Sequence, residues 1–138
     1  MIRIIRIIFL LTIVALFSCE EKGYVTDCDE CTDYEPFEAI VKIKIDENYM
    51  SGVVVKIWEG KLEDQILFDS ATVYQSSYKR FVSINKTYTI TATYHINNRV
   101  YTTIDSATPR VRYTEDMCEK PCYYIYDRSY DLRLKYTK

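Results

Sequence analysis

Hydrophobic and polar residues alternate along most of the chain over residues 36–138. A period of two is typical of β-strands that bury one face, because successive side chains point to opposite sides of the strand. The clearest alternation covers residues 37–45, 53–57, 88–96 and 130–136. In residues 88–96 we expect an inward row made of Tyr88, Ile90, Ala92, Tyr94 and Ile96. The alternating residues Thr87, Thr89, Thr91, Thr93 and His95 are expected to face solvent.

Short polar segments separate these runs and predict turns. The expected turns and breaks lie at residues 46–48, 60–61, 85–86 and 97–98. Asparagine tolerates positive φ angles, so Asn97-Asn98 suits a tight hairpin turn between residues 88–96 and a partner strand at 99–105. Pro109 and the charged residues 110–121 predict a longer loop. Short strands at this spacing, with no helical pattern, predict an all-β domain over 36–138: a single antiparallel β-sandwich of about seven strands.

The first 18 residues have a different pattern. Arg3 and Arg6 form a short basic region, and residues 7–17 are almost wholly apolar. This apolar run has the length of a signal-peptide core and is shorter than the roughly 20 residues of a spanning helix. The following Leu16-Phe17-Ser18-Cys19 resembles the lipobox of bacterial lipoproteins. An uncleaved membrane helix is the alternative interpretation of residues 1–18.

The lipobox resemblance implies that residues 1–18 are a signal peptide and that Cys19 becomes the lipid-modified first residue, carrying diacylglycerol and an acyl group such as palmitate. Several acyl chains would anchor the protein firmly, whereas one gives only marginal binding. Glu20-Glu21 resembles the surface-export signal of some Gram-negative lipoproteins. The expected location is therefore the outer membrane at the cell surface, with a periplasm-facing location as the alternative.

Residues 19–35 are strongly acidic. Eight carboxylates and a single lysine, Lys22, lie between Glu20 and Glu38. Self-repulsion keeps such a run solvated and extended, which predicts a tether between Cys19 and the sandwich. A calcium-binding loop is the alternative, with the candidate ligands Asp27, Asp29, Glu30, Asp33 and Glu35.

The overall charge argues against nucleic acid as a partner. The whole chain has a formal charge of −2, and removal of Arg3 and Arg6 with the signal leaves about −4. Proteins that bind nucleic acid select basic surfaces instead.

The chain has five cysteines. If Cys19 carries lipid, Cys28, Cys31, Cys118 and Cys122 remain, an even number in an exported protein, where disulfides are the default. Of the three pairings, we prefer the two in which the first pair of cysteines crosses to the second. A four-thiolate zinc site and a redox-active Cys28-x-x-Cys31 are the alternatives. The carboxylates beside these cysteines disfavour both.

Two strands carry a family resemblance. Residues 52–60, GVVVKIWEG, and residues 86–94, KTYTITATY, resemble the transthyretin-like, carboxypeptidase-regulatory-like sandwich. The resemblance covers about residues 38–106. It implies an accessory or interaction module more often than an enzyme.

Tyrosine is unusually frequent, with 14 in the chain. Aromatic rings with a polar tip suit glycan or protein surfaces, so Trp58, Tyr123, Tyr124 and Tyr126 are candidate binding residues. The alternative is that tyrosines fill half-buried strand positions. Trp58 is expected on the strand face opposite Val53, Val55 and Ile57.

A short sequence, Asp-Ser-Ala-Thr, occurs at residues 69–72 and again at 105–108. It resembles an O-glycosylation acceptor of some bacterial exported proteins. That resemblance implies that Ser70 and Ser106 are candidate acceptors.

Catalytic signals are weak. His95 is the only histidine, and the chain has no G-x-S-x-G, P-loop or dinucleotide-binding motif. We therefore expect no enzyme activity, no cofactor and no metal. The expected function is a lipid-anchored cell-envelope protein with a binding or structural role. The alternative is a module dedicated to glycan binding or to inhibition of an envelope hydrolase.

Overall fold

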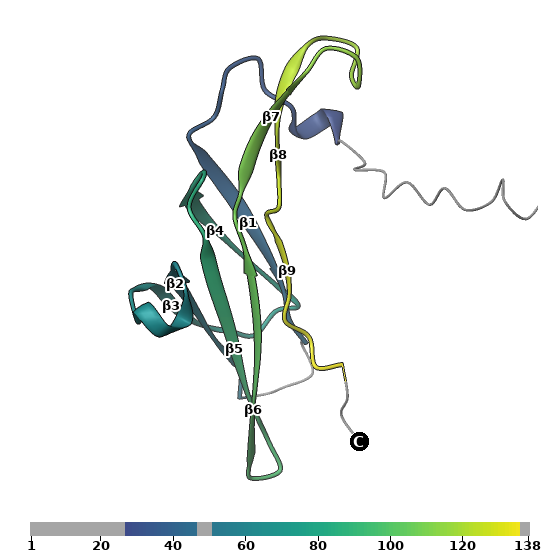
Figure 1. Cartoon of the computed structure of the whole chain (residues 1–138). Helices are drawn as coiled ribbons and strands as arrows, with labels where there is room; N and C mark the ends of the chain where they lie inside the picture. The colour runs from purple at the N-terminus through teal and green to yellow at the C-terminus, as the bar shows by residue number, and fades with distance from the viewer. Residues whose placement is uncertain (1–26, 47–50, 136–138) are drawn as a thin grey trace, which may run out of the picture.

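The computed structural model describes residues 27–46 and 51–135 (Figure 1). Cys19 and the expected signal peptide lie outside this range. The strands are β1 (Glu38–Lys44), β2 (Val53–Glu59), β3 (Leu67–Val73), β4 (Ser77–Ser83), β5 (Tyr88–Ile96), β6 (Arg99–Ala107), β7 (Arg110–Thr114), β8 (Cys122–Tyr126) and β9 (Ser129–Asp131). The described residues also form two short 3₁₀-helices, η1 (Cys28–Glu30) and η2 (Leu62–Asp64).

Two sheets form the sandwich. A four-stranded sheet has the order β3-β2-β5-β6, and a three-stranded sheet has the order β4-β1-β9. Together they contain seven strands, which confirms the predicted all-β sandwich. Strands β7 and β8 form a separate ribbon that Figure 1 shows beyond one end of the sandwich, beside η1. One pairing departs from the antiparallel pattern, because β9 runs parallel to β1.

Alternate residues of the facing strands form the core between the two sheets. Its most buried aliphatic members are Val41, Ile43, Ile45, Val53, Val55, Ile57, Val82, Ile90 and Leu132. Tyr88, Tyr94 and Tyr130 are also fully buried. The Tyr94 hydroxyl donates to the Leu132 carbonyl at 2.7 Å, and the Tyr130 hydroxyl donates to the Ala107 carbonyl at 3.3 Å. These tyrosines fill the core while their hydroxyls bond to the backbone of the opposite sheet or its margin.

The predicted hairpin turn between β5 and β6 is confirmed. Asn97 and Asn98 have φ angles of 48° and 61°, and Ile96 pairs with Arg99 across the turn. Both turn residues of a type I′ hairpin require positive φ, which asparagine supplies. Asn85 also has a positive φ of 62°, at the predicted turn after β4. The turn expected at residues 46–48 lies partly outside the described residues.

An aspartate links each outer strand of the four-stranded sheet to the other sheet. Asp69 of β3 accepts a hydrogen bond from the Tyr78 hydroxyl at 2.9 Å and pairs with Arg80 at 3.0 Å. Asp105 of β6 accepts a hydrogen bond from the Asp131 N–H at 3.2 Å. These are the aspartates of the repeated Asp-Ser-Ala-Thr sequence. Each occurrence of this sequence therefore supplies an aspartate that connects the two sheets at one edge of the sandwich.

Two expectations about the second half were wrong. Residues 110–114 form β7 rather than a loop, because each of them pairs with a residue of β8. The last strand was expected over residues 130–136, but β9 ends at Asp131. β1, the partner of β9, ends at Lys44, so no further residue of β1 can pair beyond Asp131. Leu132 is nevertheless buried, and its N–H donates to the Lys44 carbonyl at 2.9 Å.

The buried Tyr130 predicts alkaline sensitivity. Burial raises the pKa of Tyr130 above its ordinary value of 10, so folding favours the neutral phenol. The resulting stabilisation is complete below pH 10 and is lost as pH rises further, by up to about 1.4 kcal/mol per pH unit. Urea unfolding at several pH values should show a shallower alkaline decline for Tyr130→Phe than for the unmodified chain. Identical slopes would contradict this assignment.

Candidate functional site

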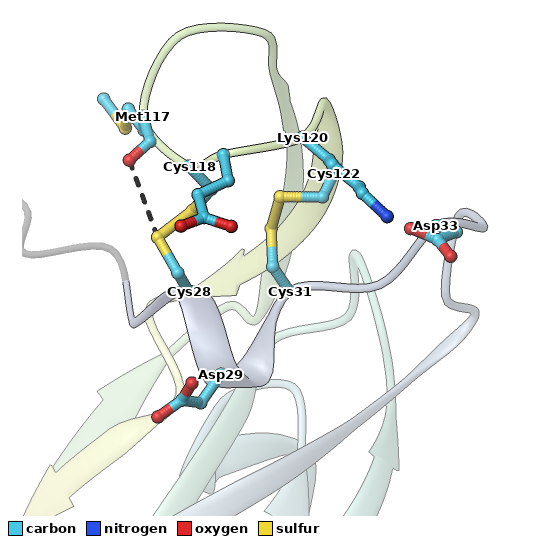
Figure 2. Close-up of a pocket in the computed structure, with 9 residues that line it drawn as sticks. Cys28, Asp29, Cys31, Asp33, Met117, Cys118, Lys120 and Cys122 are labelled. Carbon is cyan, nitrogen blue, oxygen red and sulfur yellow. Dashed lines mark hydrogen bonds between the residues drawn. A yellow bond between two sulfur atoms is a disulfide. The ribbon is translucent and has the colours of Figure 1, made fainter.

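Two disulfides attach the start of the described chain to the β7–β8 ribbon. Cys28 is bonded to Cys118 and Cys31 to Cys122, with a Cα–Cα distance of 5.7 Å in each case. This is one of the two crossed pairings that we preferred from the sequence. Figure 2 shows both bonds side by side, with η1 on one side and the ribbon on the other.

Hydrogen bonds hold residues 28–32 in place in addition to the two disulfides. The Asp27 carboxylate accepts a hydrogen bond from the Asp29 N–H at 3.1 Å and so caps η1. Thr32 and Tyr123 exchange two backbone hydrogen bonds of 2.9 and 2.8 Å. The acidic tether predicted over residues 19–35 was expected to be joined at its end by these cysteines, and the chain is attached to the domain at residues 28–32.

Glu30 connects η1 to two further parts of the fold. Its carboxylate pairs with Lys42 of β1 at 2.7 Å and with Arg128, which lies between β8 and β9. Burial lowers the pKa of Arg128. The two oxygens of the Glu30 carboxylate therefore each contact a cationic side chain.

A pocket of about 670 Å³ lies beside the disulfides. It is lined by Cys28, Asp29, Cys31, Asp33, Met117, Cys118, Glu119, Lys120 and Cys122. Figure 2 shows the Lys120 amino group directed toward Asp33. Within residues 27–46 and 51–135, the only group of three potential metal ligands consists of Cys31, Cys118 and Cys122, whose sulfurs lie within 4.8 Å of one another. Their disulfide bonds occupy the sulfur atoms that a zinc site would use.

The three candidate tyrosines of β8 do not share a surface with Trp58. Tyr124 is only 6% exposed, and its ring lies 6.3 Å from that of Tyr126. The Tyr123 ring lies 4.9 Å from Tyr113 on the neighbouring strand. These tyrosines pack on one another within the ribbon, whereas Trp58 belongs to β2 of the four-stranded sheet. The structure therefore separates the candidate binding residues into two places.

Trp58 lies on the outer face of the four-stranded sheet, opposite the inward row of β2, as predicted. Its indole N–H donates to the Thr91 hydroxyl at 3.3 Å. The Lys56 amino group lies 5.9 Å from the centre of the Trp58 ring. This contact is at the distance of a cation–π interaction. Lys56 was not identified from the sequence, although its position two residues before Trp58 places it on the same strand face.

Several hydroxyl groups lie on the same sheet face as Trp58. The Thr89 hydroxyl donates to the Gly60 carbonyl at 2.7 Å and lies 3.3 Å from the Ser106 hydroxyl. Thr93 and Thr102 are also within hydrogen-bond distance, at 3.4 Å. Thr89 and Thr91 are only 6% and 7% exposed, although their alternation with the inward row predicted solvent exposure. They lie on the outer side of the sheet, but neighbouring side chains such as Trp58 cover them.

The outer face also contains the two candidate glycosylation sites. Ser70 is exposed on β3, and its Cα pairs with that of Lys56. Ser106 is exposed on β6, and its hydroxyl is within 3.4 Å of the Tyr88 carbonyl. The sheet therefore brings Trp58, Ser70 and Ser106 onto one face, with a serine at each edge. We call this surface, made of the outward residues of β2, β3, β5 and β6, the Trp58 face.

Comparison of the chain with protein-family models, curated proteins and solved structures finds no match. Among residues 27–46 and 51–135, no helix is long and apolar enough to cross a membrane.

The disulfide pairing predicts a specific peptide map. A protease that cleaves after glutamate cuts after Glu30 and Glu119, and so separates the two cysteines of each pair. Digestion at acidic pH suppresses exchange, because the attacking thiolate is protonated there. Mass spectrometry without reductant should find Cys28 linked to Cys118 and Cys31 linked to Cys122. Bonds within the 28–31 and 118–122 pairs, or free thiols, would refute this connectivity.

Proposed function

We propose that this protein is a lipid-anchored protein of the cell envelope that binds its ligand through the Trp58 face. The observation that carries the proposal is the position of Trp58, a single indole ring on a sheet face that is otherwise rich in hydroxyl groups. The role is binding rather than catalysis.

The anchor is inferred from the sequence at Cys19. Residues 20–27 separate this cysteine from Cys28, the first residue held by a disulfide. A mechanical force on a lipid anchor would reach the β7–β8 ribbon through the disulfides. It would not act directly on β1, the central strand of the three-stranded sheet. This arrangement suits a domain held at a membrane by its N-terminal side. We propose the outer membrane at the cell surface as its location, on the basis of Glu20-Glu21.

The chemistry of the Trp58 face favours a carbohydrate ligand. Sugars present C–H groups that pack on an aromatic ring and hydroxyls that exchange hydrogen bonds with polar side chains. Trp58 supplies the ring, and its N–H bond to Thr91 fixes the ring's orientation. Lys56 and the hydroxyls of Thr93 and Thr102 supply polar groups further along the sheet, all toward the Val54 end of β2. O-glycosylation of Ser70 or Ser106 stays a prediction, to be checked by intact mass in the native host.

Replacement of Cys19 tests the anchor. We expect the full-length precursor to incorporate an alkyne-tagged fatty acid in a Gram-negative host, and Cys19→Ala to lose the label. Ser18→Ala is the matched control, because it keeps a small residue before the cysteine and should remain labelled. Equal labelling of Cys19→Ala and the unmodified chain would contradict lipidation at this position.

Replacement of Trp58 tests the binding face. Polysaccharide and lipopolysaccharide purified from the native host's envelope can be cast into native gels as probes. We expect retardation of the full chain, and an affinity about tenfold weaker for Trp58→Ala, because truncating a central aromatic residue costs over 1 kcal/mol. Tyr113→Ala removes an exposed aromatic residue of the ribbon and should bind normally. Equal retardation of both variants would remove Trp58 from the site.

A further inference from the structure

The outer strands of the described sheets differ in how they are protected against pairing with another chain. In natural proteins, charged residues, bulges or short strands prevent an edge strand from pairing with another chain. β4 carries Lys79 and Arg80, and β7 carries Arg110 and Arg112. The pairing of β2 with β3 has a register shift at Trp58. β9 contains only three residues.

β6 has fewer of these protections, because its only charged residues, Arg99 and Asp105, lie toward its two ends. It is nine residues long, contains no lysine or proline, and pairs with β5 without a register shift from Tyr88–Ala107 to Ile96–Arg99. Its outward row includes Val100 and Ile104, which are 61% and 56% exposed. A long, regular and partly apolar edge of this kind favours the addition of another strand.

The backbone groups of β6 that face away from β5 can be assigned. Residues flanking a two-residue hairpin turn form a hydrogen-bonded pair, and such pairs alternate along the ladder. Arg99, Tyr101 and Thr103 therefore bond to β5. The N–H and C=O groups of Val100, Thr102 and Ile104 point to the open side, and no described residue forms a backbone hydrogen bond with them.

We propose that β6 pairs with β6 of a second copy of this chain, antiparallel and centred on Thr102. In this register Thr102 faces its equivalent, Val100 faces Ile104, and Arg99 faces Asp105. The outward-pointing backbone groups then form hydrogen-bonded pairs, and two exposed apolar residues cover each other.

Charge favours a second copy over an unrelated strand. Arg99 forms no salt bridge with another described residue, and the pairing places it beside a carboxylate on each side of the two-fold axis. Asp105 accepts the N–H groups of Ser106 and Asp131, and its two oxygens retain capacity for an arginine. A register displaced by two residues would place Arg99 opposite Ala107 and lose both ion pairs.

The dimer would join two four-stranded sheets into one continuous sheet. Its two-fold axis is perpendicular to the sheet, so both Trp58 faces would lie on the same side. A polymeric ligand could then contact both faces at once, which raises avidity without a new contact. The dimer does not depend on the proposed function, because its test measures association without a ligand.

Cysteine crosslinking of the full chain in detergent tests the register. In a hydrogen-bonded antiparallel pair the Cα atoms are about 5.5 Å apart, which suits a disulfide. Thr102→Cys should therefore form a covalent dimer under mild oxidation. Ile104→Cys lies on the same edge but is displaced from its own equivalent, and it should crosslink poorly. Equal crosslinking of the two variants, or none above that of the unmodified chain, would overturn the proposal.

Association measured by analytical ultracentrifugation provides an independent test. Arg99→Glu places like charges opposite each other at two positions of the dimer and should weaken association by about tenfold. Arg110→Glu makes the same change of charge on β7 and should leave association unchanged. A full chain that stays monomeric at all concentrations, or equal effects of the two variants, would overturn the proposal.

Discussion

The crossed disulfides between residues 28–31 and 118–122 are the constraint on which the position of the first described segment, around η1, depends. Each closes a loop of about 90 residues, and a crosslink over such a loop stabilises a fold by roughly 4–5 kcal/mol through the unfolded chain. The two bonds span nearly the same loop, so the second adds less. They attach η1 to the ribbon and place the chain's exit toward Cys19 at that point.

The sandwich itself is joined at its edges by polar contacts. Asp69 and Asp105 link the outer strands of the four-stranded sheet to the other sheet, and the Tyr94 and Tyr130 hydroxyls bond across the core. These contacts use side chains that point inward. The outward residues remain available, which explains how a tightly packed domain can present an indole ring and many hydroxyls on one face.

The sequence predicted the core well and the strands after β6 poorly. Alternation identified the inward rows of β1, β2 and β5, because one face of each strand is buried. β7 was missed because its arginines face solvent on a two-stranded ribbon, where burial leaves only a weak pattern. The length of β9 was overestimated, because alternation of residues indicates burial and does not show where a strand ends. The end of β9 depends on where its partner β1 ends. The separation of Trp58 from the β8 tyrosines depends on topology, which alternation does not encode.

We propose that the Trp58 face binds an envelope glycan. Trp58 is the only tryptophan of the chain, so its fluorescence reports on this face alone. Titration of the full chain with the polysaccharide that retards it in native gels is therefore the most direct measurement. We predict a saturable blue shift of the tryptophan emission. Its midpoint should fall at the polysaccharide concentration that equals the dissociation constant from the gels. An unchanged emission spectrum at saturating polysaccharide would contradict the account.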